Sequence, residues 1–169
     1  SGDEVVSPAY DQIDESRYLY TNVVATSRGC PNRCDFCYNS CKNRTYVRRP
    51  IQEVLKDIES LGTRHLLFID DNFIGAPSYT CELLANLRWK DFKWSAAVTA
   101  KIADHPDLLD LMAKTGCQSL FIGFESINNS SLQGVNKGNR FEKYERLVAE
   151  IHNRGIMINA SMVFGLDGD

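Results

Sequence analysis

Three cysteines, Cys30, Cys34 and Cys37, lie close together near the start of the chain. Thiolates spaced by four and three residues can turn three sulfur atoms toward one centre from a single loop, and Gly29 and Pro31 help to bend the chain there. Iron–sulfur clusters usually take four protein ligands. Three ligands leave one iron with an open position, where a substrate or cofactor can bind. The spacing therefore predicts an iron–sulfur cluster that takes part in chemistry.

The competing interpretation is a structural zinc site with Cys41 as a fourth ligand. Zinc sites usually combine two separated pairs of cysteine or histidine residues, and no second pair is visible. The histidines are scattered along the chain, at His65, His105 and His152. We therefore favour an iron–sulfur cluster, with Cys41 either a bystander or a residue that misligates it. Two further thiols, Cys81 and Cys117, are expected to be buried and inert.

Short apolar runs alternate with amphipathic stretches along the rest of the chain. The runs predict strands at 21–27, 66–69, 94–99, 119–122 and 156–164. Apolar residues at helical spacing predict helices at 51–61, 79–87, 104–116 and 141–151. Pro50 and Gly62 suit the start and the end of the first helix, and Asn139 suits the N-terminal cap of the last.

Alternation of strands and helices implies parallel strands joined by right-handed crossovers. The strands are almost uniformly apolar, which is typical of strands covered on both faces. The fold class is therefore α/β, either a doubly wound sheet or part of a barrel. Both architectures place ligands at the carboxyl ends of the strands, where the unusual polar side chains of this chain also lie.

The composition is that of an ordinary globular protein, with 43% hydrophobic and 24% charged residues. The formal net charge of -3 does not favour a nucleic-acid partner. No apolar run is long enough for a membrane span, and we expect a cytoplasmic protein.

Residues 1–19 are polar and show no periodicity, and we interpret them as a leader or linker from a missing upstream domain. Residues 20–169 form the core, which ends on a turn just after the last predicted strand. The start at Ser1-Gly2 resembles the scar of a cleaved tag. We therefore expect missing sequence on both sides, and a core that is incomplete and inactive on its own.

The pattern Cys-x3-Cys-x2-Cys after the first predicted strand, with Phe36 just before the third cysteine, resembles the signature of the radical S-adenosylmethionine (SAM) superfamily over roughly residues 20–169. The resemblance implies a partial parallel-stranded (βα) barrel, truncated after about five βα units. It implies that Cys30, Cys34 and Cys37 bind a [4Fe-4S] cluster whose open iron is chelated by SAM. Reductive cleavage of SAM then gives a 5′-deoxyadenosyl radical, and Phe36 either lies near the adenine or packs the loop.

After the second predicted strand, the family often has a Gly-Gly-Glu motif for the amino group of SAM. This chain has Asp70-Asp71-Asn72 there instead. A carboxylate in this position can still accept hydrogen bonds from an ammonium group. Which of Asp70 and Asp71 does so is open, and the alternative is a solvated loop acid or a helix cap.

The segment 123–126 after the fourth predicted strand resembles the family segment that contacts the ribose and methionine portions of SAM. Glu125 and Ser126 can bond hydroxyl or amino groups there, and a glutamate at a buried strand end is costly unless it is paired. Asn159 in the last predicted strand can face the barrel interior. Gly165 resembles a glycine turn near the adenine.

The runs SRGCPNRCDFCYNS, FIDDNF and GFES, with Arg44, Arg48 and Pro50 between the first two, resemble radical SAM enzymes that carry an N-terminal cobalamin-binding domain. Such enzymes methylate unreactive carbons or phosphorus, or close rings. The resemblance implies cobalamin held by a domain upstream, a small-molecule substrate and a reductant protein such as flavodoxin or ferredoxin. The alternatives are a methylthiotransferase and a non-catalytic metal module, either a zinc site or an electron carrier.

Overall fold

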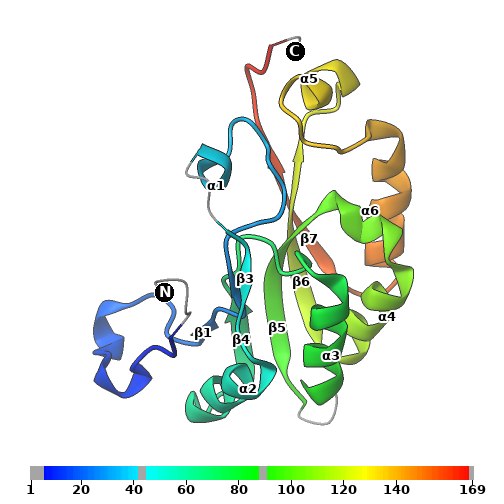
Figure 1. Cartoon of the computed structure of the whole chain (residues 1–169). Coiled ribbons are helices and arrows are strands. Elements are labelled where there is room, and N and C mark those ends of the chain that lie inside the picture. Colours follow the sequence, from blue (N-terminus) through cyan, green and yellow to red (C-terminus); the bar gives the residue numbers. More distant parts are fainter. Residues whose placement is uncertain (1–5, 42–44, 88–90, 168–169) are drawn as a thin grey trace.

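The computed structural model describes residues 6–41, 45–87 and 91–167, which form a five-stranded parallel sheet with helices packed against it (Figure 1). The strands are β1 Val23–Val24, β4 His65–Phe68, β5 Lys93–Thr99, β6 Cys117–Glu125 and β7 Met157–Met162. Their order in the sheet is β1-β4-β5-β6-β7. Because this order follows the chain and never reverses, the sheet has no switch point and is part of a barrel.

The longer helices connect successive strands of this sheet. They are α2 Ile51–Ser60, α3 Pro77–Leu87, α4 Pro106–Lys114 and α6 Tyr144–His152. Along β5, Trp94 and Ala96 are buried under the helices, whereas Ser95 and Ala97 are only half-buried. Within the described residues the helices therefore cover one face of the sheet. The expectation that both faces are covered is wrong for this part of the chain.

The first predicted strand, 21–27, is divided into two short strands with different partners. β1 lies in the main sheet, whereas β2, Ser27–Arg28, pairs antiparallel with β3, Val47–Arg48. Between them the backbone N–H of Thr26 donates to the side chain of Asp70 at 3.2 Å. A side chain thus takes the hydrogen bond that a neighbouring strand would otherwise accept, and the chain leaves the sheet at this point.

Several short elements were not predicted, because they are too brief to show periodicity. They are α1 Tyr38–Cys41, α5 Asn129–Gly134 and the 3-10 turns η1 Tyr10–Gln12, η2 Glu15–Arg17 and η3 Ala100–Asp104. The 3-10 turn η4, Phe141–Lys143, lies within the predicted helix 141–151 and leads directly into α6. Gly62 follows α2 with a positive φ of 61°, as predicted for the end of that helix. The prediction for Asn139 is wrong: its buried side chain donates to the carbonyl of Gly123 at 2.9 Å and does not cap a helix.

The core lies between the sheet and the helices and contains a group of three aromatic rings. Phe68 and Phe73 stack with centroids 4.6 Å apart, and Trp94 meets both at 5.5–5.6 Å. The indole N–H of Trp94 donates to the carbonyl of Thr115 at 2.9 Å, so this buried donor is satisfied. Among the described residues, no helix is both long enough and apolar enough to cross a bilayer.

Two glycines with positive φ allow a matched test of the packing at the end of α4. A methyl group at Gly116 (φ 89°) would run into the carbonyl oxygen of Phe92, whereas one at Gly155 (φ 71°) would have nothing within 4 Å. We predict that Gly155→Ala costs about 1–2 kcal/mol of unfolding free energy, from backbone strain alone. Gly116→Ala should cost about 1–3 kcal/mol more, because β5 must also shift. Urea unfolding of both variants checks this, and equal losses would contradict it.

Candidate functional site

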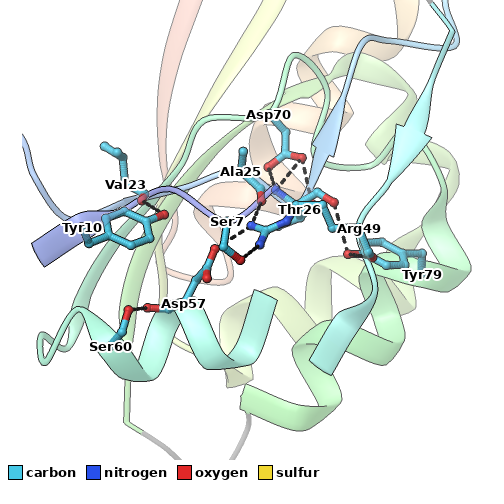
Figure 2. Close-up of polar contacts among 10 residues, drawn as sticks. All are labelled: Ser7, Tyr10, Val23, Ala25, Thr26, Arg49, Asp57, Ser60, Asp70 and Tyr79. Atoms are coloured by element: carbon cyan, nitrogen blue, oxygen red, sulfur yellow. Dashed lines mark hydrogen bonds and ion pairs between the residues drawn. The ribbon is translucent and has the colours of Figure 1, made fainter. Parts of the chain in front are cut away.

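Residues 25–29 lead into the loop that carries Cys30, Cys34 and Cys37, which we call the cysteine loop. Two consecutive acids that follow β4 fix the backbone of this approach. Asp70 is 3% exposed and accepts hydrogen bonds from the N–H and the hydroxyl of Thr26 and from the hydroxyl of Ser27 (Figure 2 draws its contact with Thr26). Asp71 is exposed, and its Oδ2 accepts the N–H of Gly29 at 3.1 Å. Both carboxylates therefore act on the backbone directly before Cys30.

This arrangement distinguishes the two acids that the sequence left equivalent. The donors of Thr26 and Ser27 occupy the carboxylate of Asp70, and burial raises the pKa of Asp70 although these hydrogen bonds oppose the change. Asp71 keeps part of its carboxylate toward solvent. Asp70 is thus a structural residue in this arrangement, and Asp71 is the acid available to a ligand.

Asn72 completes this segment and lies against the first cysteine. Its side chain is 3% exposed and hydrogen-bonds the thiol of Cys30, which lowers the pKa of that thiol against the larger effect of burial. Its Oδ1 has no hydrogen-bond partner within the described part of the chain. An unsatisfied buried acceptor beside a candidate cofactor position is the kind of group that a ligand donor can satisfy.

The middle of the cysteine loop is held by the segment that follows α5. The N–H of Asp35 donates to the carbonyl of Val135 at 3.0 Å, and the side chain of Asn136 donates to the carbonyl of Arg33 at 2.8 Å. Across the loop, Lys101 Nζ lies 2.9 Å from Asn32 Oδ1. The loop is therefore attached at its start and in its middle to elements far away in the sequence.

The three cysteines of the loop are free thiols. Cys34 is buried and Cys30 and Cys37 are half-buried, and the N–H of Cys37 donates to the carbonyl of Cys34 at 3.0 Å in a turn. Burial raises the pKa of Cys30 and Cys34, and the charge of neighbouring cysteines of the loop raises both further. The thiols are thus near enough to influence one another.

In the part of the chain that the structure describes, no three His, Cys, Asp or Glu side chains are grouped so that they could hold a single metal ion. A cubane cluster binds each thiolate at a different iron, so its ligands need not meet at one ion. Three free thiols on one loop are the kind of donor set that such a cluster takes. The side chain of Cys41 and all of Arg44 lie outside the described residues.

A buried ion pair at the end of β6 is the part of the site that the sequence did not reveal. Lys137 Nζ lies 2.7 Å from Glu125 Oε1, and both side chains are almost fully buried. Lys137 also sits 5.7 Å from the centroid of the Phe36 ring, and its charge lowers the pKa of Cys34. A methyl group on Gly123 would collide with both members of the pair. The glycine therefore makes room for it.

The remaining predicted residues lie at different distances from this centre. Ser126 is buried next to Glu125, and its hydroxyl accepts the N–H of Asn128 at 3.0 Å. Asn159 lines a hollow of about 580 Å³ on the uncovered face of the sheet. Gly165, with φ 85°, lies beyond the end of β7. The structure thus groups Phe36 with Glu125, and neither Asn159 nor Gly165 contributes to that group.

The family model described as the radical SAM superfamily matches residues 24–169. This chain belongs to that superfamily, as the cysteine spacing predicts, and the partial barrel agrees with it. Bacteriochlorophyllide d C-12(1)-methyltransferase of Chlorobaculum tepidum is 32% identical over 161 residues, which are 90% of this chain and 35% of the relative. Hopanoid C-2 methylase of Rhodopseudomonas palustris is 29% identical over 174 residues, 96% of this chain and 33% of the relative.

Solved structures give the same fold. The radical SAM methyltransferase TsrM from Kitasatospora setae, with cobalamin and a [4Fe-4S] cluster bound, matches with a TM-score of 0.76 at 24% identity, over 86% of this chain and 31% of that chain. The cobalamin-dependent SAM radical enzyme OxsB, with aqua-cobalamin bound, gives 0.70 at 26% identity, over 86% of this chain and 25% of that chain. The chain spans about a third of the length of the curated relatives named above.

We predict that Asp70→Asn removes a pH-dependent part of the stability. Burial raises the pKa of Asp70, so the stability contributed by its neutral form is complete below the ordinary aspartate pKa and is lost as the pH rises through the raised value. As the pH rises from the ordinary aspartate pKa through the raised pKa of Asp70, the unfolding free energy of the wild type should therefore fall relative to that of the variant. Denaturant titrations of both proteins measure this, and a pH-independent difference would refute it.

Proposed function

We propose that this chain is the cluster- and SAM-binding core of a radical SAM enzyme of the cobalamin-dependent methyltransferase or cyclase type. The observation that carries the proposal is the cysteine loop: three free thiols on one loop that is held at its start and in its middle by elements far away in the sequence. When bound there, the cluster and SAM supply the electron transfer and the sulfonium cleavage that yield methionine and a 5′-deoxyadenosyl radical. Cys30, Cys34 and Cys37 are the proposed ligands.

The residues around the loop supply binding groups for SAM in this proposal. Asp71 and the free Oδ1 of Asn72 lie beside Cys30 and can accept hydrogen bonds from an ammonium group. Glu125, oriented by its ion pair with Lys137, and the neighbouring Ser126 offer partners for hydroxyl or amino groups. Asp70 orders the backbone and does not bind the cofactor.

Phe36 and Gly165 are the proposed neighbours of the adenine. The Phe36 ring is 44% exposed and has Lys137 Nζ over it, so its free surface can cover an apolar group. Asn159, on the uncovered face of the sheet, is proposed to reach into the barrel interior. The burial of Cys34 limits the access of water to the cluster side of the loop.

The proposed cobalamin dependence has a different basis. The two solved structures named above are cobalamin-dependent or hold cobalamin, and the two curated relatives are methyltransferases by name. Residues 1–19 would then be the linker from an upstream cobalamin domain, with residues 20–169 forming the core. The substrate would be a small molecule, and a flavodoxin or ferredoxin in the cytoplasm would supply electrons.

A methylthiotransferase is the second candidate, because one observation favours it. Ribosomal protein uS12 methylthiotransferase RimO of Chloroherpeton thalassium is 28% identical over 160 residues, 86% of this chain. Such an enzyme would need further cluster-binding cysteines. Iron analysis of the full-length protein separates the two, because a second cluster would roughly double the iron bound per chain.

We predict that Cys34→Ala prevents stable assembly of the cluster, because two thiolates of this loop cannot hold it. After anaerobic reconstitution with iron and sulfide, the variant should retain only a small part of the wild-type iron. Cys81→Ala is the matched control, since Cys81 is a half-buried free thiol on α3 and outside the loop. Unaltered iron content in Cys34→Ala would remove the basis of the assignment.

The activity itself is tested on the full-length protein. Reconstituted anaerobically and reduced with dithionite, it should convert SAM to 5′-deoxyadenosine, measured by chromatography, and Cys34→Ala should form none. Adding SAM should also change the electron paramagnetic resonance spectrum of the reduced cluster, because SAM binds the open iron. A fully assembled cluster with an unchanged spectrum and no product would instead favour an electron carrier.

A further inference from the structure

A second buried ion pair lies under the approach to the cysteine loop, and the proposed function does not use it. Arg49 is 2% exposed and its Nη1 lies 2.7 Å from Oδ2 of Asp57 on α2 (Figure 2). The free-energy cost of taking two charges out of water often exceeds the gain from their attraction. A buried ion pair is therefore weak evidence that its role is to stabilise the fold. The contacts of Arg49 suggest what else the residue does.

The guanidinium of Arg49 joins three separate segments. Its Nη1 donates to the carbonyl of Ala25 at 3.0 Å, and its Nη2 donates to the hydroxyl of Ser7 at 2.7 Å, as Figure 2 shows. Together with the ion pair to Asp57, these contacts link three parts of the chain: the described residues before β1 that include Ser7 (the N-terminal segment), the residue that follows β1, and the helix α2. A planar guanidinium presents donors in a fixed fork, which suits it to bridge several acceptors at once.

The backbone of Arg49 acts on the next residue of the same approach. Its N–H donates to the carbonyl of Thr26 at 2.9 Å, and its carbonyl accepts the hydroxyl of Tyr79 at 2.9 Å. That hydroxyl also lies 3.2 Å from the carbonyl of Thr26. Burial raises the pKa of Tyr79 to about 12, so it remains a donor at neutral pH. The carbonyls of Ala25 and Thr26 are thus both held from the Arg49 side.

Asp70 holds the opposite side of the same short stretch through the N–H and hydroxyl of Thr26. Only Ser27, Arg28 and Gly29 then separate this point from Cys30. Fixing Thr26 from both sides, and Ala25 from the Arg49 side, sets the direction in which the chain enters the loop. The contact with Ser7 extends this control to a segment that lies outside the sheet.

We propose that Arg49 is a positioning residue for the cysteine loop, and that its bond to Ser7 makes the order of the loop depend on the docking of the N-terminal segment. The proposal rests on the proposed function only for the statement that the loop binds a cluster. It requires that loss of the Arg49 contacts increases local opening of the cysteine loop without increasing opening of the sheet.

The decisive variant removes both charges at once, as Arg49→Met with Asp57→Leu. Apolar replacement of a buried pair often preserves the fold, whereas removing one partner leaves an uncompensated charge. The full chain without cluster is treated with a thiol reagent, and labelling is followed residue by residue by peptide mass spectrometry. Cys34, 7% exposed in the loop, reports local opening, and Cys117, 3% exposed in β6, reports opening of the sheet.

We expect Cys34 to react at least roughly tenfold faster in this double variant, because hydrogen bonds from a charged group are lost, with Cys117 unchanged. An unchanged rate at Cys34 would overturn the proposal. Parallel acceleration at both cysteines would also overturn it, since Arg49 would then support the whole fold. Arg49→Lys, which keeps the charge but not the fork, should give an intermediate rate at Cys34.

The link to the N-terminal segment has its own pair of variants. Ser7→Ala should accelerate labelling of Cys34 by a few-fold, the effect of one hydrogen bond. Ser16→Ala is the control, because the hydroxyl of Ser16 donates to Asp14 within the same segment. Equal rates in Ser7→Ala and wild type would refute the dependence on the N-terminal segment.

A final measurement separates this inference from the proposed function. Reconstituted wild type and the Arg49→Met, Asp57→Leu variant are challenged with a chelator, and the variant should lose iron faster. If the wild type binds no iron at all, the proposed function fails, while the labelling rates of Cys34 still decide the role of Arg49. If both proteins lose iron equally slowly, Arg49 does not position the cluster ligands.

Discussion

The structure depends on one constraint: the backbone between β1 and the cysteine loop must leave the sheet while it is still buried. Buried backbone groups need partners, and here no parallel strand provides them. Side chains do so instead, with Asp70 accepting the N–H of Thr26 and Arg49 donating to the carbonyl of Ala25. The loop that follows can therefore have a fixed entry direction, although it belongs to no sheet and carries three free thiols.

A buried ion pair stands at each end of this loop. Arg49 and Asp57 lie under its entry, and Lys137 and Glu125 lie beside its far side, with Lys137 close to Phe36. Each pair carries a desolvation cost that well-packed apolar residues of similar size would not have. The pairs instead fix the orientation of the loop, because charged hydrogen-bonding groups constrain geometry more tightly than apolar contacts do. The loop is thus held by polar contacts, whereas the sheet below it is held by apolar packing.

This division explains which features could be predicted from the sequence. Strands and helices follow from local periodicity, so the later strands and the longer helices lie close to their predicted positions. The three cysteines follow from spacing. The partners of the acids do not, because Asp70 and Thr26 are 44 residues apart and Lys137 and Glu125 are 12 apart with no periodic relation. The predicted need of Glu125 for a partner was correct, but nothing in the sequence identified Lys137. Arg49 was missed for the same reason.

The uncovered face of the sheet indicates which part of the protein would select the substrate. The contacts that order the cysteine loop lie within the described residues, whereas the hollow of about 580 Å³ on the open face is lined by both polar and apolar side chains, among them Tyr20, Gln118 and Phe121. Relatives about three times as long have the remaining length with which to close such a hollow. Under the proposed function, chemistry common to the superfamily would therefore be built into this part of the chain, and the selection of the substrate would fall to whatever closes the barrel.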